Sequence, residues 1–366
     1  MSTQKKLYLT GEAEELDAFW TTQQTWLESR GYMLRPRYRP GGGPNKEKVQ
    51  DGKLRKHTTM DATKISDGFP VIMKILCHSK DSSELELRLN VLFSTEPLAS
   101  NPKNHCVKVL EVLEVPDYED LVLLVMPRLR IYNDPPFQTI GEGLHFIHQL
   151  FEGIDFLHDN RIAHRNIHHG NVMMDPSELY PDGFHPLNIS QNKDSTGPAK
   201  HFTRTQKPPR YFLIDFGRSG IYDPSCTTQG TPAPGAQTAP EFRDSNTKLY
   251  DPIRTDIYHV GELIRQTFFM NYEGFSFLNP LVTKMIQESP QSRPTIKECI
   301  LEFDALVASL SEGKIRGRAA PRHESLIPAG FVKSIIHRAR VISDILRNTP
   351  VIYSPNAAQK SSNLSK

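Results

Sequence analysis

Hydrophobic and polar positions recur with two different periods along this chain, and the period changes partway. Between residues 12 and 28, apolar side chains return at helical spacing, which predicts an amphipathic helix. Residues 58–65 and 69–76 instead have the pattern of strands, and Asp67-Gly68 between them predicts the turn of a β-hairpin. Further predicted elements are a helix at 82–93 and strands at 106–115 and 121–126.

After residue 126, helical periodicity dominates. Thr139 and Glu142 have the spacing of a capping box, and one apolar face continues behind them for about four turns. Polar stretches at 176–210 and 219–237 interrupt the helical pattern. Strands first and helices second predict an α+β chain with two lobes. The predicted parts are an N-terminal helical extension and loop, a strand-rich lobe, a helical lobe and a C-terminal tail with a basic amphipathic helix, at 1–57, 58–128, 129–312 and 313–366.

The composition narrows the class of protein. With 37% hydrophobic residues, the chain can bury a sizeable core. Lys and Arg total 44 against 42 Asp and Glu, and this net charge of +2 gives no electrostatic case for nucleic-acid binding. No apolar run reaches the roughly 18 residues that a membrane span needs. Four widely separated cysteines favour reduced thiols in a cytoplasmic protein, and a nuclear location stays open.

Short motifs follow one another in a recognisable order. They are Lys74 on a predicted strand, His-Arg-Asn-Ile-His-His-Gly-Asn at 164–171, Leu-Ile-Asp-Phe-Gly at 213–217, Thr-Ala-Pro-Glu at 238–241, Asp256, and Ser-Arg-Pro-Thr at 292–295. In this order the motifs resemble the signature set of the eukaryotic protein kinase-like superfamily, across roughly residues 58–310. The resemblance is closer to fungal, basidiomycete-type protein kinase domain-containing proteins, through Leu-Arg-Pro-Arg-Tyr at 34–38 and the insert Tyr-Pro-Asp-Gly-Phe-His-Pro at 180–186.

The resemblance implies a bilobal protein-kinase-like α+β fold with helical extensions at both ends, and it implies ATP and Mg²⁺ as cofactors. Asn171 and Asp215 correspond to the metal ligands, and Mg²⁺ prefers hard oxygen ligands of these kinds. Lys74 corresponds to the phosphate-contacting lysine, while Met126 and Leu129 belong to the implied nucleotide-binding set. The implied partner is a protein substrate or another protein of unknown identity.

Lys74 lies in an apolar strand, where a cation needs a negative partner. Period-2 alternation places its side chain on one face of that strand. Glu84 and Glu86 on the following helix compete for the role of helix partner. We expect Glu84, because Leu87 and Val91 then follow it at helical spacing.

Other motif residues have expected structural roles. Glu241 and Arg293 are expected to form a buried ion pair, and Asp256 is expected to brace the backbone of the segment 164–171, which corresponds to the catalytic loop of the resembled family. His164 reads as a core histidine that supports this loop. His164, His168 and His169 could also suggest a metal site, but no further Cys or His cluster completes one.

The chain departs from an active kinase at three places. Counting back five residues from Asn171 puts Asn166 where the catalytic aspartate stands, next to Arg165. An amide cannot accept the proton, so a general-base contribution of roughly 10²–10⁴-fold should be lost. His168 occupies a position that is a phosphate-contacting lysine in many kinases. The glycines at 41–43 lie too far before Lys74 for the usual phosphate-binding hairpin.

We therefore expect a kinase-like protein that binds ATP and Mg²⁺, with phosphotransfer to protein Ser/Thr weakened by Asn166; the limit of this weakening is a pseudokinase. The alternatives are a competent Ser/Thr-type protein kinase and an interaction scaffold that binds no nucleotide. A small-molecule phosphotransferase of the aminoglycoside-kinase type fits less well, because that family lacks Ala-Pro-Glu. The insert at 176–210 is a solvated loop or a docking surface. The tail helix at 331–346 packs on the domain or lies on a membrane, and the N-terminal helix is expected to be a docked extension.

Overall fold

The computed structural model describes residues 13–39, 58–77, 81–222, 239–243, 250–326, 329–347 and 349–353. The chain divides into two compact units. The first comprises 1–101, 106–129 and 180–200, and the second comprises the remaining ranges, 102–105, 130–179 and 201–366. The stretch 180–200, which the sequence division assigned to the helical lobe, groups with the first unit. The four predicted domain ranges stay a prediction.

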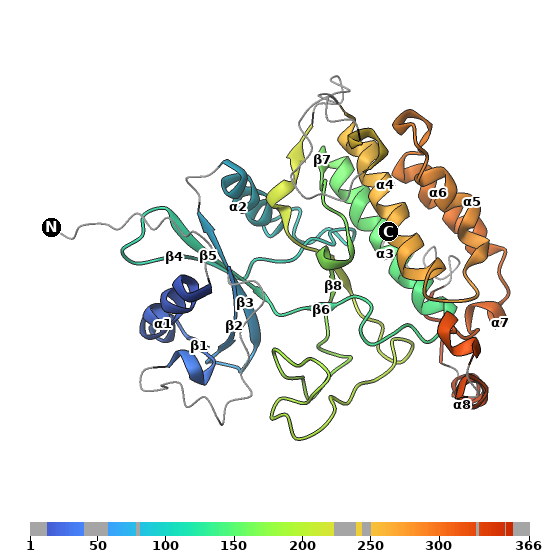
Figure 1. Ribbon diagram of the computed structural model, residues 1–366, viewed down its shortest axis with the longest axis horizontal. Helices are drawn as coiled ribbons and strands as arrows, with labels where there is room; N and C mark the ends of the chain where they lie inside the picture. Colours follow the sequence, from blue (N-terminus) through green and yellow to red (C-terminus); the bar gives the residue numbers. More distant parts are fainter. Residues whose placement is uncertain are drawn as a thin grey trace. The chain divides into compact units, whose positions relative to one another are not determined.

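The first unit is built on a five-stranded antiparallel sheet (Figure 1). Its strands, in spatial order, are β1 (Tyr32–Leu34), β2 (Thr59–Lys64), β3 (Pro70–Cys77), β5 (Leu121–Pro127) and β4 (Glu111–Glu114). The hairpin predicted from Asp67-Gly68 is confirmed, since β2 pairs with β3 and Gly68 has a φ of 72°. The strand predicted from residue 106 begins only at Glu111.

One face of this sheet is covered by helix α1 (Ala13–Ser29), which confirms the expected docked extension. Leu16, Trp20 and Leu27 of α1 are buried in one cluster with the alternate β3 residues Val71 and Met73. Because side chains alternate along a strand, the remaining residues of β3 lie on the opposite face of the sheet. Helix α2 (Asp81–Phe93) packs on that face.

The Leu-Arg-Pro-Arg-Tyr segment fastens α1 to the sheet. The hydroxyl of Tyr38 donates to the Asp17 carboxylate at 3.0 Å, and the backbone N–H of Leu34 donates to the Gln24 side chain at 3.0 Å. Arg35 forms a buried ion pair with Asp61 on β2, with 3.0 Å between Nε and Oδ1. This segment, which includes the 3₁₀ turn Pro36–Tyr38, is thus a structural clamp within the first unit.

The second unit is mainly helical. Its α-helices are α3 (Ile140–Asp159), α4 (Pro252–Ile264), α5 (Asn279–Met285), α6 (Ile296–Ala308), α7 (Glu312–Ile315) and α8 (Ala329–Leu346). A π-helical turn, Arg265–Phe269, extends α4. Two small antiparallel sheets complete the unit: β6 (Arg130–Ile131) with β8 (Val172–Met174) and β9 (Tyr211–Leu213), and β7 (Ile162–Ala163) with β10 (Gly220–Ile221). The 3₁₀ turns are His169–Asn171, Phe216–Arg218, Pro240–Phe242, Ser276–Leu278, Pro290–Ser292 and Arg322–Leu326.

Helix α3 forms the centre of this unit. Its predicted capping box is confirmed, because the Glu142 N–H donates to Thr139 Oγ1 at 3.0 Å and the Thr139 N–H donates back to the Glu142 carboxylate. Most of its side chains are buried, and it packs against α4 and α6 (Figure 1). Gly143 lets the rings of Phe268 and Phe275 approach the helix backbone, where a Cβ would lie within 3 Å of them. The five-stranded sheet and this helical unit confirm the expected α+β class with two parts.

Candidate nucleotide and metal site

Lys74 on β3 forms an ion pair with Glu86 of α2, and the expectation of Glu84 is wrong. The distance from Lys74 Nζ to Glu86 Oε1 is 2.5 Å. The Glu86 side chain is 6% exposed and that of Lys74 is 19% exposed, so the pair lies in a largely dry environment. Glu84 instead faces solvent and pairs with Arg88 at 3.5 Å.

The register of α2 explains this correction. The buried residues of the helix are Glu86, Leu89, Asn90 and Phe93, which recur at i, i+3, i+4 and i+7. Val91, which follows Glu84 at helical spacing, is 40% exposed. The face of α2 that meets the sheet therefore begins at Glu86, two residues beyond the predicted position.

Met126 lies at the end of β5 on the sheet face that carries Lys74. It pairs with Ile72 across the two strands and packs against a buried cluster of Leu76, Val122 and Leu124. Leu129 follows two residues after the strand and is half-buried. The structure thus groups Lys74 and Met126 on one face of the sheet, while their assignment to a nucleotide stays a prediction.

The loop at 164–171, which the sequence predicts to be the catalytic loop, is held by Asp256 on α4, as predicted. One carboxylate oxygen accepts the backbone N–H of His164 at 2.8 Å, and the other accepts that of Arg165 at 2.7 Å. His158 also contacts this carboxylate at 3.1 Å. Burial alone raises the pKa of the Asp256 carboxyl, but the hydrogen bond from His158 and the neighbouring histidines outweigh burial, and the pKa is lowered. The carboxylate therefore stays ionised beneath the loop.

His164 is a core residue, which confirms its predicted structural role. Its side chain has no exposed surface, and its Nε2 lies 3.2 Å from the carbonyl oxygen of Ile214. Its ring packs on that of Phe216, with centroids 5.3 Å apart. Burial lowers the pKa of His164, so the ring is neutral and Nε2–H donates to the carbonyl. His164 thus connects the catalytic loop to the Asp-Phe-Gly segment.

Asn171 and Asp215 are brought together by the pairing of β8 with β9. Val172 pairs with Leu213, and the Ile214 N–H donates to the Asn171 carbonyl at 3.1 Å. Both residues therefore occupy the same end of this ribbon. Asp215 has a left-handed backbone, with φ 67° and ψ 70°. This conformation is uncommon for a residue other than glycine and clusters at functional sites.

The side chain of Asn171 is oriented by the loop itself. Its Nδ2 donates to the backbone carbonyl of Asn166 at 2.9 Å. Its Oδ1 accepts no hydrogen bond from any residue that the structure describes. An amide fixed in this way presents an unused oxygen at the end of the ribbon that also carries Asp215. This donor set fits a hard divalent cation such as Mg²⁺.

Asn166 and His168 depart from the kinase pattern in different ways. Asn166 is 5% exposed, and its side chain makes no hydrogen bond within the described part of the chain. His168 is half-buried, and its Nδ1 accepts the backbone N–H of Gly170 at 3.0 Å. The ring nitrogen nearest the backbone therefore stabilises the loop to which His168 itself belongs. The glycines at 41–43, which are too far before Lys74 for the usual phosphate-binding hairpin, lie outside the described residues.

The predicted ion pair between Glu241 and Arg293 is confirmed. It is bidentate, with oxygen–nitrogen distances of 2.9 and 2.6 Å, and the Arg293 side chain has no exposed surface. Thr255 donates a further hydrogen bond to Glu241 at 2.7 Å. Arg165 of the catalytic loop lies over the ring of Tyr250, 5.6 Å from its centroid. Tyr250 had no signal in the sequence, because no motif includes it.

The insert contains a second residue that sequence reasoning missed. Arg204 is 1% exposed, so the solvated-loop interpretation is wrong at this position. Its guanidinium donates to the carbonyls of Tyr132 and Pro135 and lies 4.5 Å from the centroid of the Phe137 ring. Earlier in the insert, Phe184 packs beneath the guanidinium of Arg128, 4.7 Å from the ring centroid. These two arginines anchor the insert at separate points, one in each unit.

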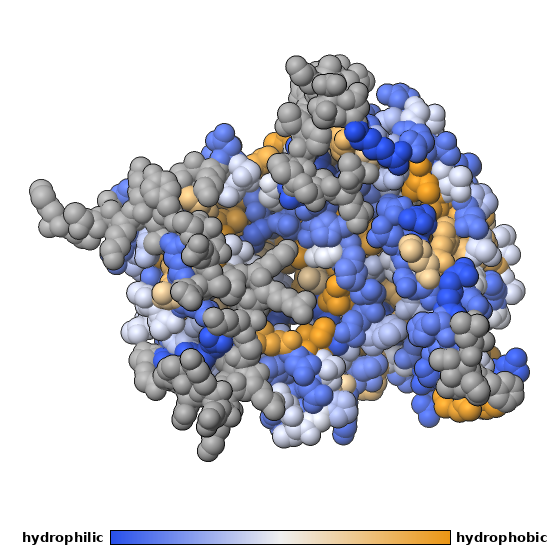
Figure 2. All heavy atoms as spheres, in the orientation of Figure 1, coloured by the Kyte–Doolittle hydropathy of each residue, from blue (hydrophilic) through white to orange (hydrophobic). Residues whose placement is uncertain are grey.

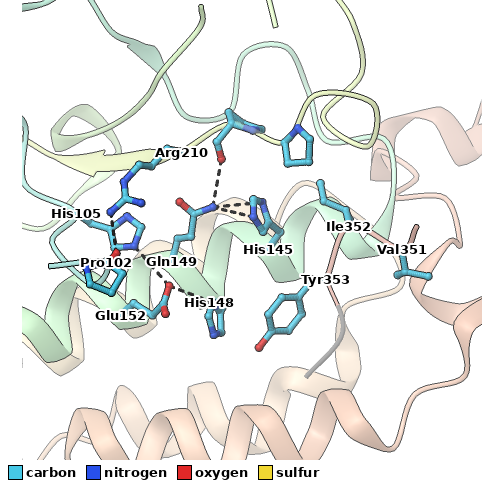
Figure 3. A pocket seen from close by; sticks show the side chains of 12 residues that line it. Pro102, His105, His145, His148, Gln149, Glu152, Arg210, Val351, Ile352 and Tyr353 are labelled. Carbon is cyan, nitrogen blue, oxygen red and sulfur yellow. Dashed lines mark hydrogen bonds and ion pairs between the residues drawn. The ribbon is translucent and has the colours of Figure 1, made fainter. Parts of the chain in front are cut away.

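A separate cavity of about 390 Å³ lies along α3 (Figure 3). His105 and His148 both approach the Glu152 carboxylate, at 3.5 and 3.3 Å, and the ring of Tyr353 lies against His148. Despite these side chains, no group of three or more His, Cys, Asp or Glu residues in the described ranges is arranged to hold a metal ion. The metal site suggested by His164, His168 and His169 is thus not found among them.

Comparisons with known proteins point to kinases over part of the chain. The serine/threonine-protein kinase CAK1 of Saccharomyces cerevisiae is 32% identical over 148 residues, which cover 38% of this chain and 30% of that protein. A probable cyclin-dependent serine/threonine-protein kinase of Dictyostelium discoideum is 29% identical over 112 residues, or 31% of this chain and 7% of that protein. The chain thus spans less than a third of the length of these curated relatives. No family model matches it.

Part of the chain is therefore similar in sequence to protein kinases. Its antiparallel sheet and its mainly helical unit are the two parts that this similarity implies. Together they confirm the expected bilobal protein-kinase-like α+β fold. Among the described helices, none is long and apolar enough to cross a bilayer.

Proposed function

We propose that this protein binds ATP with Mg²⁺ and that its phosphotransfer to Ser or Thr of a protein substrate is weakened by Asn166. The observation that carries the proposal is the orientation of Asn171. Its Nδ2 is committed to the Asn166 carbonyl, so Oδ1 is left for a cation on the ribbon end that carries Asp215. A scaffold that binds no nucleotide has no use for an amide and a carboxylate placed in this way.

Lys74 supplies the second part of the proposal. Its ammonium is held by Glu86 on the sheet face that also carries Met126, with Leu129 beyond the strand. A cation fixed at this position would contact the phosphates, and Met126 and Leu129 would contact the rest of the nucleotide. Charge stabilisation by a positioned lysine and a metal ion is the main catalytic requirement of phosphoryl transfer.

Asn166 is proposed to limit the chemistry. A carboxylate at this position would accept the proton of the substrate hydroxyl, whereas an amide oxygen can only orient that hydroxyl. Arg165 and His168 are proposed to belong to the catalytic site with Asn166. The His168 side chain caps the turn before Asn171. The fungal relationship, the cytoplasmic location and the protein partner are likewise proposals that the composition and the kinase similarity favour.

The proposal is tested by the melting temperature of the full chain with ATP, in the presence and absence of Mg²⁺. Ligand at about 100 times its Kd should stabilise the protein by roughly 2.7 kcal/mol. Asp215→Ala should abolish the Mg²⁺-dependent part of the shift. Asp182→Ala, which changes an exposed aspartate in the insert, is the matched control and should leave the shift unchanged. If millimolar ATP produces no shift in the unmodified protein, the scaffold interpretation replaces this one.

The role of Asn166 is tested separately by Asn166→Asp. We expect phosphotransfer to a generic protein substrate, or to the protein itself, to rise at least about tenfold, which is part of the usual general-base contribution. Equal and measurable activity in both forms would instead establish the competent-kinase alternative. If ATP binds but neither form transfers phosphate, the defect lies elsewhere, in the phosphate loop or at His168.

A further inference from the structure

Helix α8 presents an apolar strip to solvent. Of the sixteen large hydrophobic side chains that are exposed among the described residues, six lie on this one helix. They are Val332, Ile335, Ile336, Ile342, Ile345 and Leu346, each more than half exposed. Figure 2 shows the corresponding apolar surface at the lower right, where Figure 1 places α8. Isolated exposed hydrophobic residues are ordinary, but a continuous strip marks an interaction surface.

Much of the strip faces solvent, while Ile336, Ile342 and Ile345 also line cavities between α8 and the rest of the second unit. At about 100° per residue, all of the strip residues except Ile345 fall within an arc of about 120°. Ser334, His337 and Val341 lie on the opposite side of the helix and are half-buried. His337 donates from Nε2 to the Arg316 carbonyl at 3.0 Å, and Ser334 accepts a hydrogen bond from Arg318. The helix is therefore docked by the narrow side that carries Ser334, His337 and Val341, as one sequence interpretation expected, and its broader apolar side stays exposed.

Basic residues border the strip on both sides. Arg338 lies about 40° beyond one edge of the arc, and Arg340 and Arg347 lie within about 40° of the other. The guanidinium groups of Arg338 and Arg347 have no acidic partner within the described ranges. Lys333 is different, because it pairs with Glu324 at 2.5 Å. The single acidic residue of the helix, Asp344, lies on the half-buried side, and the Glu324 carboxylate beside the strip is taken up by Lys333 and Arg318.

We propose that α8 is a membrane-surface helix whose apolar strip enters the headgroup region of an anionic bilayer. An apolar arc with cations on both borders is complementary to such a surface, since hydrocarbon takes up the strip and lipid phosphates and carboxylates meet the arginines. A protein groove or a second copy of this chain would have to supply acidic groups on both borders. An anionic bilayer presents such groups over its whole surface, so both borders are met at once.

The test is cosedimentation of the full chain with vesicles of phosphatidylserine and phosphatidylcholine, compared with vesicles of phosphatidylcholine alone. We expect binding to the anionic vesicles that falls as the salt concentration approaches about 1 M, where the Debye length is about 3 Å. Arg338→Gln with Arg347→Gln should weaken binding roughly 25-fold, at about fivefold for each basic residue near the surface. The matched charge-conserving pair, Arg338→Lys with Arg347→Lys, should retain binding.

The apolar half of the proposal has its own variants. Ile335→Ser with Ile342→Ser should weaken vesicle binding at least about tenfold. Leu301→Ser, which changes an exposed leucine on α6, should leave binding unchanged. Equal melting temperatures among these variants show that the fold is intact. Failure of the unmodified chain to bind anionic vesicles would overturn the proposal, as would dimerisation by light scattering that the isoleucine variants abolish without any vesicle binding.

Discussion

Replacing Glu86 with Gln removes the carboxylate with which α2 pairs to Lys74, and the cost follows from the geometry of the pair. The two side chains meet at 2.5 Å, with 6% of Glu86 and 19% of Lys74 exposed. Breaking a fully buried ion pair costs about 3–5 kcal/mol, and a hydrogen bond to a charged group contributes about 1.5–3 kcal/mol. Because Lys74 retains some contact with water and Gln still accepts a hydrogen bond, we expect a loss of about 2 kcal/mol in the free energy of unfolding.

Glu84→Gln provides a matched control on the same helix. Glu84 and Arg88 have half or more of their side chains exposed and lie 3.5 Å apart. Exposed pairs one helical turn apart contribute about 0.3–0.5 kcal/mol, so this variant should be nearly neutral. Both changes remove one negative charge from α2, and the control therefore separates the specific contact with Lys74 from the general effect of charge.

Urea unfolding of both variants measures the difference, since a change in midpoint at constant slope reports stability. The Kd for ATP, measured on the same samples, should rise more for Glu86→Gln than for Glu84→Gln. Equal midpoints for the two variants would refute the assignment of Glu86 as the partner of Lys74. A larger loss for Glu84→Gln would restore the original sequence prediction.

Two further predictions use other parts of the second unit. Glu241→Gln should lower the free energy of unfolding by about 3–5 kcal/mol, because it leaves the unexposed Arg293 without its carboxylate. The control, Glu302→Gln, breaks the more exposed pair with Lys284 and should cost less than about 1 kcal/mol in the same unfolding assay. Burial lowers the pKa of His145 from its ordinary 6.5 to about 4, so its contribution to stability is complete above about pH 6.5 and is lost as the pH falls towards 4. His145→Gln should therefore flatten the dependence of the unfolding midpoint on pH in that window, and an unchanged slope would contradict this reasoning.

Local signals in the sequence predicted the elements that depend on neighbouring residues. The capping box of Thr139 and Glu142 is one such signal, because both hydrogen bonds close within a single turn. Asp256 and the pair of Glu241 with Arg293 were predicted for another reason, since a motif fixes their roles even across long separations. In both cases the information lies in the identity and spacing of the residues themselves.

The missed features depend on packing that no local pattern reports. Helix α2 carries Leu85, Leu87 and Leu89 at alternate positions, and such spacing does not define one helical face. The choice between Glu84 and Glu86 thus depended on how α2 meets the sheet. Arg204 was missed because a charged residue in a polar stretch normally stays in water, and its burial depends on backbone carbonyls some seventy residues earlier.

The catalytic loop shows why a missing catalytic carboxylate need not disturb the fold around it. Three of the contacts that position this loop use its backbone groups, namely the His164 and Arg165 N–H groups on Asp256 and the Asn166 carbonyl that accepts from Asn171. The Asn166 side chain takes part in none of them. Asn166→Asp should accordingly leave the unfolding midpoint nearly unchanged while it alters phosphotransfer. A change of several kcal/mol would show that the loop geometry depends on the amide, and any gain in activity could then no longer be ascribed to proton transfer alone.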